Sequence, residues 1–492
     1  MIKKIVEFGD FQTPYEFALE VCTFIKNKGI RPSVILEPTC GKGNFIEASA
    51  KTFNDADEIL GFEINKEYLE SVKYKLSEAY RKKIKLLQSD FFTFDWKALF
   101  KTLGPNHLVL GNLPWVTSSQ LGTIGSNNLP YKSNFQCDKG IDAITGKANF
   151  DISEWMLIHL LEWMQDQKSY LAMLCKTTVA RKVLKHAWNN DFKLTKAEMF
   201  RIDSKKHFDV AVDACLLLCS IGEATTNRTC KVYDGFSDKK ITTFGIHGSE
   251  LIVDIETYNQ LADLDSEGHV FRKWRSGLKH DCSKVMVLRK ENSFFKNGLG
   301  ETINIENKYL YPYIKGTEIA RGYKGKPDKW VIVTQKHVGQ ETTVINKNAP
   351  MTWNYLNRHA KYLDKRKSSI YKQKPPFSIF GIGDYSFTDW KVAISGLHKK
   401  IHFEIIPPHK NKTCMIDDTC YLLPCGSYEE ASLIAELLNS ETAKKFLSCF
   451  IFWDSKRPIN NNVLKRIDIV ELAKNQGQYK KLKKLIKTNS LF

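Results

Sequence analysis

The sequence predicts an α/β fold for the first half of the chain and a second domain of mixed helices and strands after it. Helix-like stretches at 65–80 and 151–165 alternate with short apolar runs that are typical of buried strands. These runs lie at 33–36, 58–62, 83–88, 107–110, 169–174 and 214–219. Such alternation predicts a largely parallel sheet with helices on both faces.

Length and pattern divide the chain into domains. Its 492 residues exceed the size of one ordinary domain. After about residue 245 the alternation fades into shorter runs with many turn residues, among which basic and aromatic side chains interleave. We therefore expect an α/β domain at 1–245 and an α+β domain at 246–492.

The net charge of +18 is concentrated in the second half of the chain. Residues 1–250 carry +3 and residues 251–492 carry +15. A basic surface attracts polyanions, and such asymmetry indicates nucleic-acid binding. A basic surface that serves only solubility explains the same charge, so the charge alone does not decide the function.

Composition also indicates where the protein works. The 12 cysteines include no C-x-x-C pair, and a chain of this size does not need disulfides. No apolar window approaches the roughly 20 residues of a membrane span, and the N-terminus has no signal-peptide core. We therefore expect a cytoplasmic protein with reduced thiols and no membrane contact.

In a parallel sheet the ligand lies beyond the carboxyl ends of the strands. The first predicted strand runs into LEPTCGKGNF, where Gly41 and Gly43 allow a tight turn against a ligand. A dinucleotide fingerprint would need a third glycine where Ile46 stands, so a pyrophosphate site is disfavoured. Taken alone, this turn is as easily structural.

Two acids follow the next strands along the chain. Glu63 comes about 20 residues after the glycines, the usual distance for a carboxylate that binds ribose hydroxyls. Asp90 ends the third strand and is followed by Phe91. Either acid alone could be a helix cap or a solvated carboxylate. Together with the glycine turn, they indicate a nucleoside site.

The fourth predicted strand leads into GNLPW, and here the sequence resembles the AdoMet-dependent DNA adenine-N6 methyltransferases of restriction–modification systems. The resemblance covers about residues 8–220. FQTPYEFALEVCTFI resembles the family's first cofactor helix, LEPTCGKGNF its AdoMet loop and GNLPW its catalytic signature. The order of motifs, with a target-recognition domain last, implies a Rossmann-like methyltransferase sheet and S-adenosyl-L-methionine (AdoMet) as the cofactor.

The resemblance also assigns site residues. The cofactor-binding residues that it implies are Thr13, Pro14, Glu37, Pro38, Gly41, Gly43, Glu63, Ile64, Asp90, Phe91 and Asn112. The catalytic residues that it implies are Asn112, Leu113, Pro114, Trp115 and Phe208. The family signature is Asp, Asn or Ser, then any residue, then Pro, then an aromatic residue. Here Leu113 stands where many relatives carry proline, which leaves the backbone carbonyl intact.

The chemistry of the reaction accounts for these residue types. The lone pair of the adenine amine is delocalised into the ring, so the enzyme must accept hydrogen bonds from its N–H groups. The Asn112 side chain and the Leu113 carbonyl supply two acceptors. Pro114 restricts Leu113 to an extended backbone, and Trp115 offers a flat face on which the base stacks. The methyl donor is already activated as a sulfonium, so we expect no metal site.

A base inside a duplex cannot reach such a pocket, so we expect the adenine to be flipped out. By resemblance, KKHFDVAVDACLLL matches the family segment whose phenylalanine holds the flipped base, which points to Phe208. Burial in ordinary core is an equally good explanation of this residue. The stretch 116–150 is longer than a routine connection. We expect it to cover the adenine pocket or touch DNA, with simple disorder as the alternative.

In the second half, WRSGLKH and IFWDSKRPINNNVLKRI resemble segments of target-recognition domains. The predicted function is site-specific methylation of adenine N6 in double-stranded DNA by a monomer, which protects the DNA from a separate cognate restriction endonuclease. The cofactor motif begins within the first fifteen residues, so we expect no fused nuclease.

Two alternatives share parts of this pattern. A methyltransferase acting on protein glutamine or RNA can carry the same signature, because it also targets a planar nitrogen, but it does not obviously need a basic second half. A catalytically dead DNA-specificity subunit is the non-enzymatic alternative. The intact residues Asn112, Pro114, Trp115, Glu63 and Asp90 argue against such decay.

Overall fold

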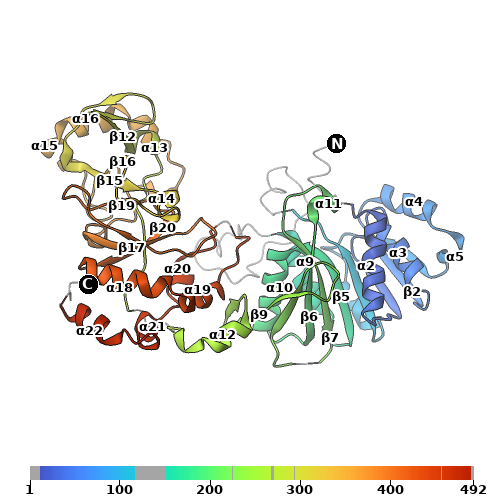
Figure 1. Cartoon of the computed structure of the whole chain (residues 1–492). Helices are drawn as coiled ribbons and strands as arrows, with labels where there is room; N and C mark the ends of the chain where they lie inside the picture. The colour runs from blue at the N-terminus through green and yellow to red at the C-terminus, as the bar shows by residue number, and fades with distance from the viewer. Residues whose placement is uncertain are drawn as a thin grey trace. The chain divides into compact units, whose positions relative to one another are not determined.

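The computed structural model describes residues 12–116, 151–223, 225–266, 271–292, 294–455 and 457–488. The chain divides into two compact units, Met1–Ile255 and Glu256–Phe492 (Figure 1). The boundary that we predicted, between residues 245 and 246, falls inside strand β9 (Lys240–His247). Because β9 pairs with β8 (Thr229–Tyr233) and β10 (Glu250–Ile252), the sheet holds these residues in the first unit.

The first unit is built on a ten-stranded sheet with the order β10-β9-β8-β6-β7-β5-β4-β1-β2-β3. Its other strands are β1 (Val34–Glu37), β2 (Glu58–Glu63), β3 (Ile84–Gln88), β4 (His107–Asn112), β5 (Ser169–Lys176), β6 (Leu194–Ile202) and β7 (Ala214–Ile221). The neighbours from β3 to β5 are parallel, and β7 lies antiparallel between β5 and β6. All six strands that the apolar runs predict are present, as β1 to β5 and β7.

Helices cover both faces of this sheet (Figure 1). They are α2 (Tyr15–Asn27), α3 (Asn44–Thr52), α4 (Lys66–Lys75), α5 (Glu78–Arg81), α6 (Trp96–Thr102), α9 (Ile152–Trp163), α10 (Thr177–Asn189) and α11 (Ser204–Phe208). Leu108 and Val109 are neighbours on β4 and point to opposite faces. Val109 packs in the core with α6, α9 and α10, and Leu108 packs in the core with α2, α3 and α4. The predicted α/β class is confirmed.

The second unit contains two smaller sheets, with the orders β11-β20-β17-β18 and β14-β13-β12-β16-β15-β19. The strands are β11 (Arg275–Ser276), β12 (Val287–Glu291), β13 (Phe294–Lys296), β14 (Thr302–Ile303), β15 (Leu310–Ile314), β16 (Lys329–Ile332), β17 (Trp390–Ser395), β18 (Glu404–Ile406), β19 (Met415–Ile416) and β20 (Cys420–Cys425). All neighbouring strands are antiparallel except β15 and β19.

Helices complete the second unit and give it the predicted α+β architecture. They are α12 (Ile255–Gln260), α13 (Ser283–Met286), α14 (Gly316–Ala320), α15 (Val344–Asn348), α16 (Pro350–Arg358), α17 (Ala360–Asp364), α18 (Tyr428–Asn439), α19 (Glu441–Ser448), α20 (Asn461–Leu464), α21 (Ile469–Asn475) and α22 (Tyr479–Thr488). The 3-10 helices are Ala262–Leu264, Asn307–Tyr309, Ser369–Tyr371 and Asp384–Ser386.

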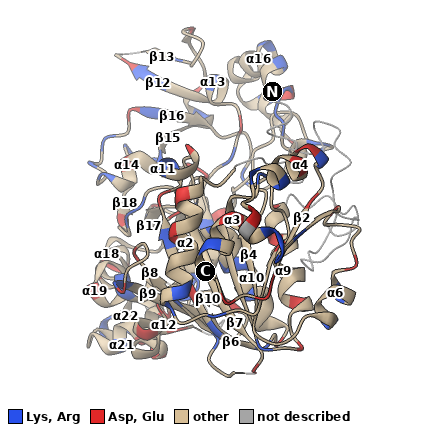
Figure 2. Cartoon of the chain, turned by 90° about the vertical axis from the view of Figure 1, so that its right-hand side faces the viewer, with Lys and Arg blue, Asp and Glu red and all other residues tan. Residues whose placement is uncertain are grey.

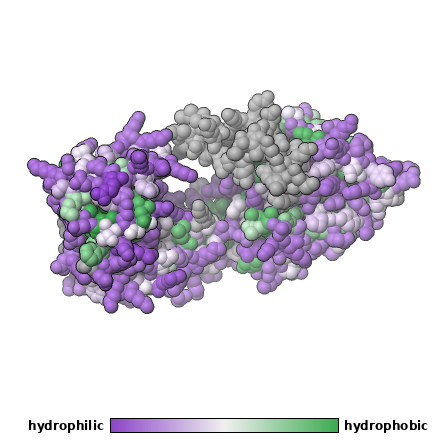
Figure 3. Space-filling model, turned by 90° about the horizontal axis from the view of Figure 1, so that it is seen from above, coloured by the Kyte–Doolittle hydropathy of each residue, from purple (hydrophilic) through white to green (hydrophobic). Residues whose placement is uncertain are grey.

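Hydrophilic residues cover most of the surface in Figure 3, and hydrophobic residues gather on that face in small separate patches. Every cysteine of the described ranges is buried and free. Within the same ranges, no helix combines the length and the apolar character that crossing a membrane requires.

Candidate active site

A cavity lies at the carboxyl ends of β1 to β4. Strand β1 pairs with β2 on one side and with β4 on the other, so the strand order reverses here, where open α/β sheets bind their ligands. The predicted site residues that line the cavity are Thr13, Glu37, Pro38, Gly41, Glu63, Ile64, Asp90, Phe91, Asn112 and Pro114. Segments that are far apart in the sequence thus meet at one place.

Five predicted residues are not part of the cavity wall: Pro14, Gly43, Leu113, Trp115 and Phe208. The Pro14 carbonyl accepts the Ala18 N–H at 2.9 Å, in the first turn of α2. Gly43 precedes α3 with a φ of +75°, and a Cβ there would lie 2.5 Å from Val72 Cγ1. Only glycine fits this close approach, so both residues shape the chain around the cavity. The Leu113 side chain is buried in the core.

Glu63 holds the glycine turn that follows β1. One carboxylate oxygen of Glu63 accepts the Gly41 N–H at 2.9 Å, and the other accepts the Asn65 N–H at 2.8 Å. Gly41 has a φ of +51°, and a Cβ there would lie 2.7 Å from Gln12 Oε1. That Gln12 oxygen accepts the Lys42 N–H at 3.0 Å. Because a carboxylate oxygen has more than one acceptor lone pair, these bonds do not exclude the expected ribose contact.

Two buried polar atoms of the cavity residues fit a cationic ligand. Thr13 Oγ1 and Glu37 Oε2 are buried and have no hydrogen-bond partner within the described ranges. Burial, reinforced by nearby Glu63, raises the pKa of Glu37 well above its ordinary value of 4.5. A positive charge beside a buried carboxyl group favours its ionised form. AdoMet offers a sulfonium and an ammonium group, so these residues fit the cofactor.

Asp90 and its neighbours form the rim at β3. Asp90 Oδ1 accepts the Phe92 N–H at 2.9 Å, which closes a turn directly after the strand. The Phe91 carbonyl accepts the Trp96 Nε1–H at 2.8 Å, and the Phe91 ring is buried. Ile64 is 39% exposed although it is apolar. An exposed apolar side chain in a cavity wall suits a flat ligand face.

The predicted catalytic residues leave β4 at the edge of the cavity. Asn112 is the last residue of β4 and pairs with Leu174 of β5. Its carbonyl accepts the Thr39 hydroxyl at 3.4 Å. Gly111 has a φ of +144°, and a Cβ there would lie 3.2 Å from Glu37 Cγ. The strand therefore passes close to Glu37 and brings Asn112 to the same wall.

The Trp115 and Phe208 rings contact each other. Their centroids lie 5.2 Å apart with the planes at 60°. Trp115 is 5% exposed, and Phe208, the last residue of α11, packs partly buried against the same core. A base sandwiched between two rings needs about 7 Å, twice the usual contact distance, so these rings would have to separate. The contact is also consistent with the alternative explanation of Phe208, that it is an ordinary core residue.

Sequence reasoning missed an anchor of residues 112–115, which carry predicted catalytic residues and which we call the catalytic segment. Lys176, the last residue of β5, donates to the Trp115 carbonyl at 3.2 Å and to Asp151 Oδ2 at 2.5 Å. The Ile152 N–H donates to the Val116 carbonyl at 2.9 Å. The segment after Asn112 is thus tied to the start of α9. One signal was available, because Lys176 directly follows an apolar strand and so lies at the same sheet edge as Asn112.

Two predictions about the site stay predictions. Within the described residues, no group of three or more His, Cys, Asp or Glu side chains could hold a metal ion. Residues 117–150, which make up nearly all of the stretch expected to cover the adenine pocket, lie outside the described ranges.

A cavity at the strand-order reversal of a Rossmann-like sheet, with Asn-Leu-Pro-Trp at its edge, defines an AdoMet-dependent methyltransferase. No family model matches the sequence. The chain is 46% identical over 472 residues to the type II methyltransferase M.NspV from Nostoc sp.. The aligned region covers 96% of this chain and 98% of that protein. The chain therefore belongs to the type II methyltransferases of restriction–modification systems, and its cofactor is AdoMet.

Two further similarities are more limited. The fold is similar to that of the type IIL restriction–modification enzyme MmeI in complex with DNA, with a TM-score of 0.57 and 12% identity over 96% of this chain and 69% of that chain. At this identity the similarity shows the fold alone. A 92-residue stretch is 34% identical to ribosomal RNA small subunit methyltransferase A of Mycoplasmoides gallisepticum, covering 19% of this chain and 32% of that protein.

Proposed function

We propose that this enzyme transfers the methyl group of AdoMet to the N6 amine of an adenine that is flipped out of duplex DNA. The observation that carries the proposal is the position of Asn112. It ends β4 in the wall of the cofactor cavity and is followed by Leu113, Pro114 and Trp115. Membership of the type II methyltransferases supports DNA as the substrate. The pair of acceptors supports an exocyclic amine as the methylated group.

The residues at this edge act on the amine. AdoMet supplies a methyl group that is already activated by a positive sulfur. The Asn112 side-chain oxygen and the Leu113 carbonyl accept hydrogen bonds from the two N–H groups and favour a more tetrahedral nitrogen, whose lone pair is then available for attack. These bonds strengthen as the nitrogen changes shape, so they stabilise the transition state more than the bound base.

Trp115 and Phe208 hold the base in this proposal. Flipping costs a few kcal/mol of unpairing and unstacking, and stacking on one aromatic face returns about 1 to 3 kcal/mol. The two rings lie 5.2 Å apart. They therefore part when the base enters, and the base replaces their mutual contact.

We assign catalysis to the first unit and DNA recognition to the second. The charge of +15 on residues 251–492 supports this division, because Lys and Arg neutralise phosphates. The methylated site protects DNA from a separate cognate restriction endonuclease, and the enzyme acts as a monomer in the cytoplasm. An RNA target has weaker support, because the match to a ribosomal RNA methyltransferase covers 19% of this chain.

The experiment that tests this proposal is expression of the full chain in a host that lacks DNA methylation. Genomic DNA is then digested to nucleosides for mass spectrometry and sequenced with a modification-sensitive method. We expect N6-methyladenine at one short sequence, and none in a host that expresses the Asn112→Ala variant. N4-methylcytosine in place of N6-methyladenine, or methyl transfer confined to RNA or protein, would overturn the proposal.

A further inference from the structure

A two-stranded ribbon projects from the second unit. It consists of β12 and β13, and Figure 2 shows it extending away from the rest of the unit with Lys and Arg near its end. The strands are antiparallel, with Arg289 opposite Lys296 and Glu291 opposite Phe294. We call these two strands the β12–β13 ribbon. At its base β12 also pairs with β16 and β13 with β14, so Lys290, Glu291 and Phe294 form the part that lies beyond these neighbouring strands.

Phe294 at the end of the ribbon is 59% exposed. A phenylalanine has no polar atom that gains from contact with water, and this exposure leaves most of its apolar surface wet. The next residue, Phe295, behaves differently, because its ring packs edge-on against Trp330 at a centroid distance of 5.7 Å. The ribbon therefore has an inward aromatic side chain that holds it and an outward one, Phe294, whose ring stacks on no aromatic ring among the described residues.

The outward face of the ribbon is also basic. Arg289 lies opposite Lys296 of β13 and opposite Lys329 of β16, so three basic residues form a row across three strands. The Lys296 amine is 2.7 Å from Glu291, and its side chain is 44% exposed. Lys329 is held by Glu318 and Asp328 at 3.3 and 2.8 Å. Arg289 is exposed, whereas Lys290, also exposed, lies opposite Phe295 and therefore on the other face of the ribbon.

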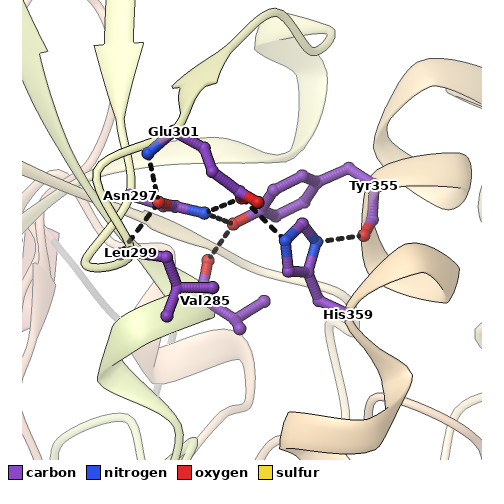
Figure 4. A network of polar contacts seen from close by, with 6 residues as sticks. All are labelled: Val285, Asn297, Leu299, Glu301, Tyr355 and His359. Carbon is purple, nitrogen blue, oxygen red and sulfur yellow. Dashed lines mark hydrogen bonds and ion pairs between the residues drawn. The ribbon is translucent and has the colours of Figure 1, made fainter.

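The base of the ribbon is held by a polar network that is buried except for Glu301 (Figure 4). Asn297, directly after β13, donates to the Tyr355 hydroxyl at 3.1 Å and to Glu301 at 2.6 Å. The Tyr355 hydroxyl donates to the Val285 carbonyl at 2.8 Å. His359 contacts Glu301 at 2.7 Å and the Tyr355 carbonyl at 2.8 Å. The network thus joins both ends of the ribbon to α16 and to the residue after it.

Such a network fixes the direction of the ribbon. Asn297, Tyr355 and His359 are 6%, 5% and 3% exposed. Buried polar groups are costly unless each is satisfied, and satisfied networks specify one geometry. The ribbon is therefore a rigid arm, with the exposed Phe294 ring at its outer end and the basic pair Arg289 and Lys296 nearer its base.

We propose that the β12–β13 ribbon contacts duplex DNA, with Arg289 and Lys296 on phosphates and Phe294 packed against the bases. The inference rests on the proposed function, because it takes DNA as the substrate. Charge complementarity selects this partner, and a two-stranded ribbon fits the major groove of DNA. Proteins that deform DNA use apolar side chains, including phenylalanine, against base steps. The ribbon thereby positions the duplex on the second unit.

The test uses the full-length protein and a fluorescein-labelled duplex that contains the methylated sequence. Binding is measured by anisotropy between about 50 and 200 mM salt. The association constant falls as salt rises, and each lost phosphate contact reduces the magnitude of the negative slope of log K against log salt by about 0.9. The variant R289Q/K296Q should reduce the magnitude of this slope by about 2. Its matched control is K97Q/K101Q on the exposed face of α6, which removes the same charge and should leave the slope within about 0.5 of the wild-type value.

Phe294 is tested separately. Phe294→Ala should weaken duplex binding about 10-fold or more, as for loss of a base contact, and Phe294→Trp should keep near-wild-type affinity because it keeps an aromatic face. AdoMet affinity and the midpoint of thermal unfolding should not change in either variant, because the side chain is exposed.

The outcomes separate this inference from the proposed function. Wild-type slopes and affinities in all ribbon variants, with DNA methylation intact, would overturn the inference alone. A change of oligomeric state in Phe294→Ala without a change in DNA affinity would also overturn it and identify a second copy as the partner. If the wild-type protein neither binds nor methylates DNA, the proposed function fails first and the inference fails with it.

Discussion

The Lys176 amine donates a 3.2 Å hydrogen bond to the Trp115 carbonyl, across the carboxyl ends of two neighbouring strands. The same amine contacts Asp151 Oδ2 at 2.5 Å. The Lys176 and Asp151 side chains are 21% and 10% exposed, so the ion pair is largely shielded from water. An ion pair of this kind fixes the backbone that carries Leu113 and Pro114 more firmly than packing alone, because a charged donor makes stronger hydrogen bonds.

Lys176→Met should therefore lower methyl transfer through the position of the catalytic segment. We expect kcat to fall about 10- to 100-fold, since small misplacements of reacting groups cost on this scale. AdoMet affinity should stay near the wild-type value, and Lys176→Arg should restore part of the rate. Lys182→Met is the matched control, because Lys182 makes an ion pair with Glu154 at 2.9 Å that does not touch the segment. Equal losses in the two Met variants would show a general effect on stability.

Glu37→Gln should stabilise the protein without cofactor and weaken AdoMet binding. Burial raises the pKa of Glu37 above its ordinary value, so its contribution to stability is fully present below about pH 4.5 and is lost as the pH rises through the folded-state pKa. The free energy of unfolding of the variant should thus rise by roughly 1 kcal/mol at pH 8, as is usual when a destabilising functional group is replaced, and should rise little at pH 4.5. Thermal unfolding and calorimetry measure the two effects. Exposed Glu67→Gln is the control, and a destabilised Glu37→Gln protein with normal AdoMet affinity would contradict the assignment.

Glu63→Ala should weaken AdoMet binding by about 1 to 3 kcal/mol, because it removes a charged acceptor from the cavity. It also releases the Gly41 and Asn65 N–H groups, which Glu63 accepts at 2.9 and 2.8 Å. Glu63→Gln keeps one of the two acceptor oxygens, so its AdoMet affinity should lie between those of the wild type and Glu63→Ala. Calorimetric titration gives the affinities, with exposed Glu78→Ala as the control. Unchanged affinity in Glu63→Ala would remove Glu63 from the cofactor site.

The second unit should lose stability in mild acid through His280. Burial lowers the pKa of His280 from 6.5 to about 4, and its Nδ1 accepts the Cys282 N–H at 3.0 Å. The unfolded chain binds a proton below about pH 6.5 that the folded chain does not bind until about pH 4, so stability falls as the pH decreases between these values. The loss by pH 4 is roughly 3 kcal/mol.

His280→Asn keeps an acceptor and removes the titrating group, so its stability should vary less between pH 4 and pH 6.5. Urea unfolding at several pH values measures this slope for the wild type and the variant. His337→Asn is the control, because the His337 side chain is 59% exposed. Identical slopes for the wild type and His280→Asn would contradict the role of His280.

The sequence predicted the central strands because each is a short apolar run. It also predicted that Glu63 and Asp90 lie in the cavity wall, because each stands at the end of such a run. It did not predict β6, β8, β9 or β10. In β6 the buried residues do not alternate strictly with exposed ones, since Ala197 to Phe200 are all buried. The strand therefore shows neither the alternation of a half-buried strand nor, with Glu198 in its middle, the unbroken apolar run of a fully buried one.

The contacts that complete the site depend on distant parts of the chain. Lys176 and Trp115 are 61 positions apart, and no pattern within a short window can report such a contact. The Trp115–Phe208 pair was predicted through resemblance alone, and its closed geometry at 5.2 Å comes from packing. The polar network around Asn297 has no sequence signature, because its members lie in separate segments.

The most direct test of the proposed function is single-turnover methylation by Asn112→Ala on a duplex that contains the methylated sequence. AdoMet affinity and duplex affinity are measured for the same protein, and Asn189→Ala, at the exposed end of α10, is the control. In the proposed mechanism Asn112 accepts a bond that strengthens in the transition state, so we expect the rate of methyl transfer to fall at least about 100-fold while both affinities stay within a few-fold of the wild-type values. A near-wild-type single-turnover rate in Asn112→Ala would contradict the catalytic assignment.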